Sequence, residues 1–169
     1  MSSNPMVTLV SKDGFEFQAT LPAVKQSITL RIMLEVLDEE QTTGLPIPIP
    51  EVEGETLQKI IEWCEYHCQD SLPELEKKHT PRGNGKKANK LPKWDENFLA
   101  VSDRDLLFKL TNAANYLDIP LLLRYAVCTI ARKLEHMSTE EMREFLNIQN
   151  DFTPAEEASI RVDNAWLTK

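Results

Sequence analysis

The stretch V-T-L-V-S-K-D-G-F-E-F-Q-A, from Val7 to Ala19, predicts two short strands joined by a tight turn. Phe15, Phe17 and Ala19 alternate with polar residues, which is typical of a strand that has one face on a core. The polar run S-K-D-G between the strands ends on glycine and indicates a hairpin turn. We therefore expect the sheet of this protein to begin near the start of the chain.

The segment after the hairpin has helical spacing. Residues 21–27 and 28–37 are both predicted to be helical, and the second has four apolar residues in register, namely Ile28, Ile32, Val36 and Leu37. A longer helix is predicted over residues 54–68, where apolar residues recur at i, i+3, i+4, i+7 and i+11. That stripe consists of Leu57, Ile60, Ile61, Cys64 and Cys68.

Two unusual segments flank this longer helix. The motif P-I-P-I-P at residues 46–50 removes a backbone donor at every second position, so a strand there must lie at an edge or be very short. Ile47 and Ile49 are expected to pack inward. Residues 70–93 contain Pro, Gly, Lys and Asn and almost no large apolar residue. A loop of that length and composition is predicted to be disordered.

The second half predicts a series of helices. Residues 95–101 form a short one, and another begins at Asp103. Pro120 suits the first turn of the next helix, and residues 121–134 are apolar nearly all round, as in a central buried helix. Two capping boxes, S-x-x-E at 138–141 and T-x-x-E at 153–156, then start the last two helices.

The last helix, over residues 155–165, has a thin apolar face. It offers only Ala155, Ala158, Ile160, Val162 and Ala165 to a core. A well-started helix that buries little of itself is suited to binding a partner, although an ordinary amphipathic terminal helix has similar features.

Composition restricts the class of protein. The net charge of −8 disfavours nucleic-acid and anionic-membrane binding in general. No apolar run approaches the 18 residues of a spanning helix, and no signal peptide is visible. Three cysteines make a poor disulfide framework, so we expect a reduced, intracellular protein. The predicted loop at residues 70–93 is basic, because Lys and Arg outnumber Glu between Pro73 and Lys93. This basic loop could bind nucleic acid, but it lacks the interleaved aromatic residues that binding of single-stranded nucleic acid requires.

No catalytic constellation stands out. Cys64, His67 and Cys68 lie within one helical turn, but zinc would need a second pair of ligands at the right spacing. We therefore expect core cysteines with His67 at the rim. Cys128 and His136 are a conceivable nucleophile pair, yet a cysteine in an apolar helix is usually inert. We expect no enzyme, no metal and no cofactor.

Several aromatic residues have two interpretations. Tyr116, at a predicted helix end, is either core or an exposed anchor for a partner. Phe152 either staples the last helix at its start or lines a groove together with Ile148. Trp166 is either a lid on the core or an interface anchor.

The chain resembles the Skp-type adaptor family of SCF ubiquitin ligases over nearly its whole length. The two most specific motifs are A-A-N-Y-L-D-I at 113–119 and N-I-Q-N-D-F-T-P at 147–154 with the A-S-I-R-V-D-N-A-W ending. P-I-P-I-P-E-V, L-Q-K-I-I-E-W-C-E-Y-H and W-D-E-N-F-L support them. The resemblance implies an α+β fold: a BTB/POZ-type domain with a small three-stranded sheet over residues 1–135, and a helical F-box-binding extension over residues 136–169.

The same resemblance implies two binding sites. Asn115 and Tyr116 would bind a cullin. The F-box protein would be bound by eight residues of the extension, namely Leu146, Ile148, Asn150, Asp151, Phe152, Ile160, Asn164 and Trp166. We interpret the chain as a diverged paralogue, because its loop is basic where the family's is acidic, Arg124 and Tyr125 alter one helix, and Leu146 replaces the usual Phe.

The function implied is that of a non-enzymatic adaptor that bridges a cullin to F-box substrate receptors for ubiquitination. The alternative is a BTB-type scaffold that self-associates without cullin, and a homodimer of the free chain fits either hypothesis.

Overall fold

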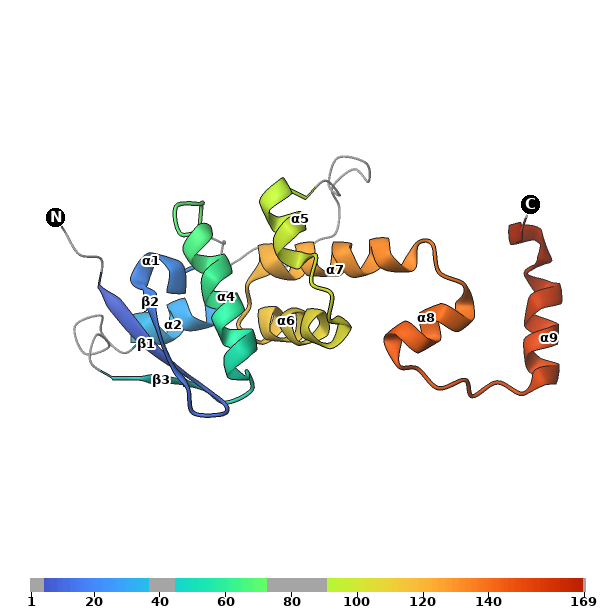
Figure 1. Ribbon diagram of the computed structural model, residues 1–169, viewed down its shortest axis with the longest axis horizontal. Helices are drawn as coiled ribbons and strands as arrows, with labels where there is room; N and C mark the ends of the chain where they lie inside the picture. Colours follow the sequence, from blue (N-terminus) through green and yellow to red (C-terminus); the bar gives the residue numbers. More distant parts are fainter. Residues whose placement is uncertain (1–4, 37–44, 73–90, 169) are drawn as a thin grey trace. The chain divides into compact units, whose positions relative to one another are not determined.

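The computed structural model describes residues 5–36, 45–72 and 91–168, with side chains as far as Trp166. Its contacts divide the chain into two compact units, residues 1–132 and 133–169 (Figure 1). The predicted domains, residues 1–135 and 136–169, are functional assignments that this division does not test. Most of the predicted basic loop lies outside the described residues.

The hairpin predicted at the start of the chain is confirmed. Strand β1 (Met6–Ser11) pairs antiparallel with β2 (Glu16–Thr20), and the turn between them carries Gly14 at φ 83°. Strand β3 (Ile47–Ile49) lies parallel to β1 on its other side, so the order is β2-β1-β3. A small three-stranded sheet followed by helices is the predicted α+β fold.

Side chains of the sheet follow the predicted alternation with one exception. Ile47 and Ile49 are buried and Pro48 between them is exposed, as expected of an edge strand. Ala19 is buried, but Phe15 is 62% exposed. Phe15 lies in the turn before β2 begins, so the alternation of the strand does not extend to it.

The helices α1 (Leu21–Val24) and α2 (Ile28–Val36) follow the hairpin. The predicted register of α2 is wrong, because Ile32 and Val36 are exposed. The face of α2 that packs inward instead carries Leu30 and Leu34. Leu37, also predicted in that register, lies outside the described residues.

Helix α4 (Gly54–Tyr66) packs on the sheet (Figure 1). Its predicted stripe is confirmed, since Leu57, Ile60 and Cys64 are buried. The Gly54 N–H donates to Asp13 Oδ1 at 2.8 Å, so the hairpin turn supplies the first polar partner of this helix. A Cβ at position 54 would lie 2.9 Å from the Phe15 ring, so a larger residue there would have to displace that ring.

Helices α5 (Lys93–Leu99), α6 (Arg104–Tyr116) and α7 (Pro120–Leu134) complete the first unit. The Asp103 carboxylate accepts from the Asp105 N–H at 2.9 Å and caps α6. The prediction that α7 is buried all round is wrong, because only Leu122 and Ala126 of this helix are buried. The division between the two units falls within α7, where the core of the first unit ends.

A buried polar cluster joins α4 to α5. The Asp95 side chain is 0% exposed, and its Oδ1 accepts from Trp63 Nε1 at 2.8 Å and lies 3.1 Å from His67 Nε2. The other ring nitrogen of His67 lies 2.5 Å from Asp70 Oδ2. His67 is therefore buried between two carboxylates, and the prediction that it lies at the rim is wrong.

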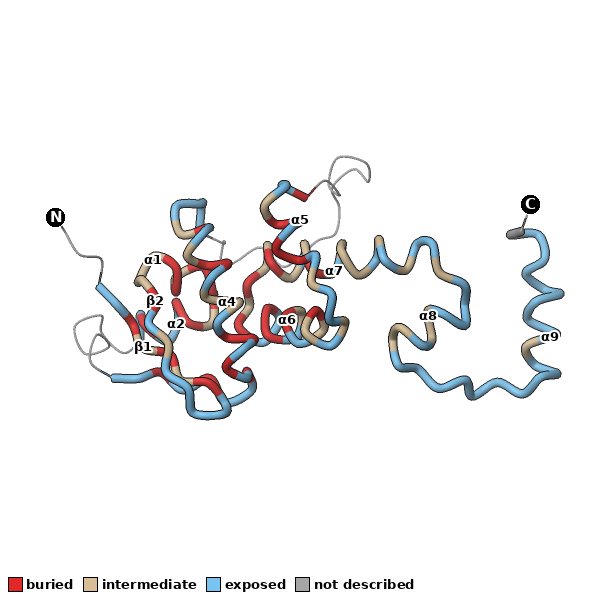
Figure 2. Tube along the Cα trace, in the orientation of Figure 1, coloured by how far each residue is buried: buried red, intermediate tan, exposed pale blue. Residues whose placement is uncertain are grey.

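The second unit contains α8 (Thr139–Leu146), α9 (Pro154–Asp163) and a 3-10 turn, η1 (Ala165–Thr168). Both predicted capping boxes are present, and Pro154 occupies the first turn of α9. Every residue of α8 and α9 is described and none is buried, so Figure 2 draws both helices in pale blue and tan without red. The second unit therefore lacks the apolar core that organises the first.

Candidate partner-binding surfaces

The turn between α6 and α7 fixes Tyr116 at the last position of α6. Asp118 adopts the left-handed conformation at φ 49°, and its N–H donates to the Asn115 carbonyl at 3.2 Å. The Ile119 N–H reaches back to the Ala114 carbonyl at 2.8 Å. This pair of hydrogen bonds is a Schellman motif, which ends a helix at a defined residue.

The start of α2 holds the same turn from the other side. Ser27 Oγ donates to the Leu117 carbonyl, and the Ile28 N–H donates to the Asp118 carbonyl at 3.0 Å. Because Leu117 is buried, the turn cannot move without disturbing the core. The backbone of Tyr116 is thus rigid, whereas its side chain is 40% exposed. Of the two interpretations of Tyr116, the structure excludes plain core.

Sequence reasoning missed the apolar residues beside Tyr116. The Thr29 hydroxyl lies 3.5 Å from the Tyr116 carbonyl oxygen, and Ile32 and Met33 follow one turn later on α2. Both side chains are exposed. We call Asn115, Tyr116, Ile32 and Met33 the Tyr116 surface. The available signal was that α2 has two apolar faces, one with Leu30 and Leu34 and one with Ile32 and Val36, of which a short helix can pack only one inward.

A hollow of about 320 Å³ opens on the other side of Tyr116. Lys109 and Glu53 form an ion pair across it, with 2.6 Å between Nζ and Oε2. The hydrogen bond to Glu53 raises the pKa of Lys109. The lining comprises Lys12, Glu51, Val52, Glu53, Thr56, Lys109, Asn112, Ala113 and Tyr116.

In the second unit, the predicted motif N-I-Q-N-D-F-T-P contains a second Schellman motif. Asn147 is left-handed at φ 53°, its N–H donates to the Glu144 carbonyl, and the Ile148 N–H donates to the Arg143 carbonyl at 2.8 Å. Sequence reasoning missed this helix end, although asparagine is a residue that tolerates the conformation. The Schellman motif ends α8 at this point, and Ile148, directly after it, is exposed.

The start of α9 is fixed by its capping box. The Thr153 N–H donates to Glu156 Oε2 at 2.8 Å, and the Glu156 N–H donates to Thr153 Oγ1 at 3.3 Å. The hydrogen bond from the Thr153 backbone lowers the pKa of Glu156. Phe152 just before it is exposed. The Arg143 guanidinium lies 6.0 Å from the centre of the Phe152 ring, at cation–π distance.

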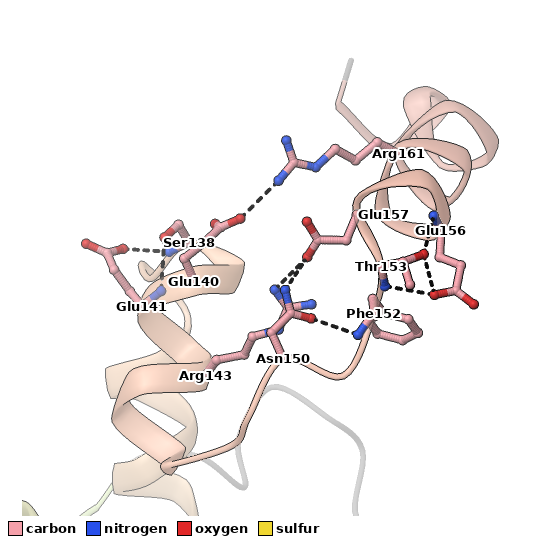
Figure 3. A network of polar contacts seen from close by, with 10 residues as sticks. All are labelled: Ser138, Glu140, Glu141, Arg143, Asn150, Phe152, Thr153, Glu156, Glu157 and Arg161. Carbon is pink, nitrogen blue, oxygen red and sulfur yellow. Dashed lines mark hydrogen bonds and ion pairs between the residues drawn. The ribbon is translucent and has the colours of Figure 1, made fainter.

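Polar links also join α8, the connecting segment and α9 (Figure 3). Glu157 Oε1 accepts from Arg143 at 3.0 Å and from Asn150 Nδ2 at 2.9 Å. Hydrogen bonds from Asn150 and Arg143 lower the pKa of Glu157. Asn150 also accepts from the Phe152 N–H at 3.2 Å, so its side chain both shapes the loop and contacts α9.

The remaining predicted residues of this unit differ in their surroundings. The Trp166 side chain is 70% exposed. Asn164 donates to the Ile160 carbonyl at 2.9 Å and closes the end of α9. Leu146 is half-buried, and Asp151 and Ile160 are exposed. We call Ile148, Phe152, Ile160 and Trp166 the tail apolar residues.

The described residues offer little to other chemistry. They contain no group of three or more His, Cys, Asp or Glu side chains that could hold a metal ion. Burial raises the pKa of the Cys64 thiol to about 12, which keeps it protonated and unreactive. None of the helices in the described part of the chain has the length and apolar composition that a bilayer crossing requires.

Comparison with known proteins now decides the family. Residues 5–69 match the model described as "Skp1 family, tetramerisation domain", and residues 120–167 match "Skp1 family, dimerisation domain". The "E3 ubiquitin ligase complex SCF subunit sconC" of Arthroderma benhamiae is 41% identical over 95% of this chain and 93% of its own length. The chain belongs to the Skp1 family.

Other relatives are similar to this chain over nearly its whole length. The subunit sconC of Aspergillus terreus is 40% identical over 98% of each chain. The "Suppressor of kinetochore protein 1" of Schizosaccharomyces pombe is 38% identical over 95% of this chain and 96% of its own. The Skp1-family models include all tail apolar residues, whereas Asn115 and Tyr116 lie between the two matched segments. The Skp1-family tetramerisation domain covers the three-stranded sheet and helices α1, α2 and α4 of the first unit.

Proposed function

We propose that this chain is an adaptor of a cullin–RING ubiquitin ligase, which bridges a cullin to F-box substrate receptors. The supporting observation is identity of about 40% along nearly the whole chain to relatives named as SCF subunits. The adaptor has no catalytic role of its own and works in the cytoplasm and nucleus. Its contribution to ubiquitination is to present two binding surfaces at once.

The F-box protein binds the second unit. The support is physical: α8 and α9 have well-defined ends, yet they bury none of their residues. The tail apolar residues are exposed in the described structure and therefore available to a partner. Asn150, Asp151 and Asn164 supply polar contacts at the border, and Leu146 adds apolar area. A partner that folds against both helices buries about 2,000 Å² in total.

The cullin binds the Tyr116 surface. Tyrosine is among the residues that most often dominate binding energy, and this one combines a rigid backbone with an exposed ring. Exposed Ile32 and Met33 extend the apolar area. Asn115, also exposed, provides an amide for hydrogen bonds beside it.

Co-purification tests the adaptor function. The full chain is expressed with fragments of several F-box proteins and with the amino-terminal part of a cullin, and a ternary complex is expected on size exclusion. Failure to bind any of the F-box fragments would contradict the proposal. Light scattering of the chain alone and with cullin tests the alternative, since a self-associating scaffold gives a dimer that cullin does not dissociate.

The variant Tyr116→Lys separates the two surfaces. It should abolish cullin binding and leave F-box binding unchanged, because the change lies outside the second unit. Met6→Lys is a matched control, since Met6 is similarly exposed at 43% but lies at the start of β1. Loss of both activities in Tyr116→Lys, with Met6→Lys intact, would mean that Tyr116 serves folding alone.

A further inference from the structure

The second unit raises the question of what keeps α9 next to α8 before a partner arrives. None of the residues of these two helices is buried, so apolar burial contributes little to their association. Each helix is about ten residues or shorter, a length at which isolated helices are marginal in water. Polar contacts between them therefore have more influence here than they would on a packed domain.

Glu157 is the centre of those contacts (Figure 3). Its Oε1 accepts both from Arg143 on α8 and from Asn150 in the connecting segment. Arg143 and Glu157 are only 21% and 26% exposed, so water screens their charges less than it does on an open surface. The guanidinium also lies near the Phe152 ring, which orients an apolar residue proposed to meet the partner.

The two charges also suit the helices that carry them. Arg143 lies in the last turn of α8, where a cation is favoured, and Glu157 lies in the first turn of α9, where an anion is favoured. A second pair, Arg161 with Glu140, has the same 3.0 Å separation. Its side chains are 71% and 62% exposed, so it contributes much less and serves as an internal control.

We infer that Arg143, Asn150 and Glu157 form a latch that positions α9 and Phe152 for the F-box partner while leaving the tail apolar residues uncovered. These three are positioning residues: they act on the partner through the placement of α9. The inference rests on the proposed function for its binding readout. It predicts that an apolar interface acquires a dependence on salt, because salt screens the latch and loosens α9 in the free chain.

The test measures the dissociation constant for an F-box fragment in about 0.1 M and about 1 M NaCl, across which the screening length falls from about 10 Å to about 3 Å. Arg143→Met and Glu157→Gln should each weaken binding about two- to fivefold at low salt, and the double variant no more than either one. At high salt the difference from the unchanged chain should vanish. Arg143→Lys should restore most of the affinity, and Arg161→Gln should have no effect.

Hydrogen exchange of the free chain provides a readout that needs no partner. Amides in the first two turns of α9 should exchange faster in Arg143→Met than in the unchanged chain or in Arg161→Gln. The unchanged chain could bind F-box fragments while Arg143→Met alters neither the salt dependence of binding nor the amide exchange. That result would reject the latch and leave the proposed adaptor function supported. If no F-box fragment binds but the amides of α9 exchange faster in Arg143→Met, the contact between α8 and α9 is supported and the proposed adaptor function is rejected.

Discussion

Two polar networks connect helices in this protein, and they differ in their access to water. In the first unit, Asp95 joins Trp63 and His67 in a site from which solvent is excluded. In the second unit, Glu157 joins Arg143 and Asn150 at a surface that remains partly wet. When one partner is removed from the buried network, a polar group is left without water or a hydrogen-bond partner. In the exposed network, water replaces the lost partner.

This difference matches the roles proposed for the two units. A buried network is costly to rearrange, because a polar atom that loses its partner inside a protein has no water to replace it. It suits a unit that must present Tyr116 from a rigid frame. The exposed network positions α9 without covering its apolar residues, which suits a unit that must bury those residues against a partner.

Asp95→Ala should cost about 3 kcal/mol of unfolding free energy, because Trp63 and His67 each lose a buried partner. The measurement is urea unfolding of the full chain. Glu96→Ala is the control next to it: Glu96 pairs with Arg132 at 3.2 Å on the surface, and its loss should cost less than about 1 kcal/mol. If the two variants lowered the unfolding free energy equally, the buried polar contacts of Asp95 would be no more stabilising than a surface ion pair.

Phe152→Ala should weaken F-box binding by about 2 kcal/mol, or roughly thirtyfold, while the unfolding free energy stays the same. The reason is that Phe152 is exposed in the free chain, so its truncation opens no cavity. Isothermal titration and urea unfolding measure the two quantities. Val162→Ala on α9, at an even more exposed apolar residue, should reduce binding much less.

The two left-handed helix ends provide a matched pair. Asp118→Ala and Asn147→Ala should each cost about 1 kcal/mol, because alanine adopts that conformation poorly. In the first unit the cost should appear as lower global stability. In the second it should appear only as faster exchange of the Ile148 amide, which donates to the Arg143 carbonyl. The glycine variants at both positions should be neutral or stabilising.

Acid should loosen the helix starts of the second unit. Capping hydrogen bonds lower the pKa of Glu141 and Glu156 below the ordinary value of 4.5. Their stabilisation is therefore fully present above pH 4.5 and is lost as the pH falls through the lower folded-state pKa. NMR amide shifts of α8 and α9 between neutral and acidic pH measure this. Glu156→Gln should reduce the response of α9 to the part that comes from Glu157, whose pKa is also lowered, and leave the response of the Glu141 cap in α8 unchanged.

Features set by neighbouring residues could be predicted from the sequence. The hairpin turn, the proline edge strand and both capping boxes depend on a few adjacent residues, and all are present. The register of α2 could not be predicted, because Leu30 and Leu34 offer an apolar face as good as that of Ile32 and Val36. Periodicity does not choose between two such faces on one short helix.

Contacts between residues that are distant in the sequence could not be predicted either. Trp63 and Asp95 are far apart in the sequence and separated by the basic loop, so nothing local indicates that they share a hydrogen bond. The burial of His67 and the partial exposure of α7 follow from the same long-range packing. For the candidate surfaces, the sequence indicated Tyr116 and the tail apolar residues but not Ile32, Met33 or the contacts of Glu157.

The prolines of β3 have a consequence for self-association of the backbone. Among the described residues β3 pairs only with β1, so its other edge is a possible template for a stray strand. Three of the five residues at 46–50 are proline and have no N–H to donate. Growth of the sheet into aggregates is thereby disfavoured at this edge. A protein that must keep apolar side chains exposed for its partners is protected there against pairing by backbone hydrogen bonds.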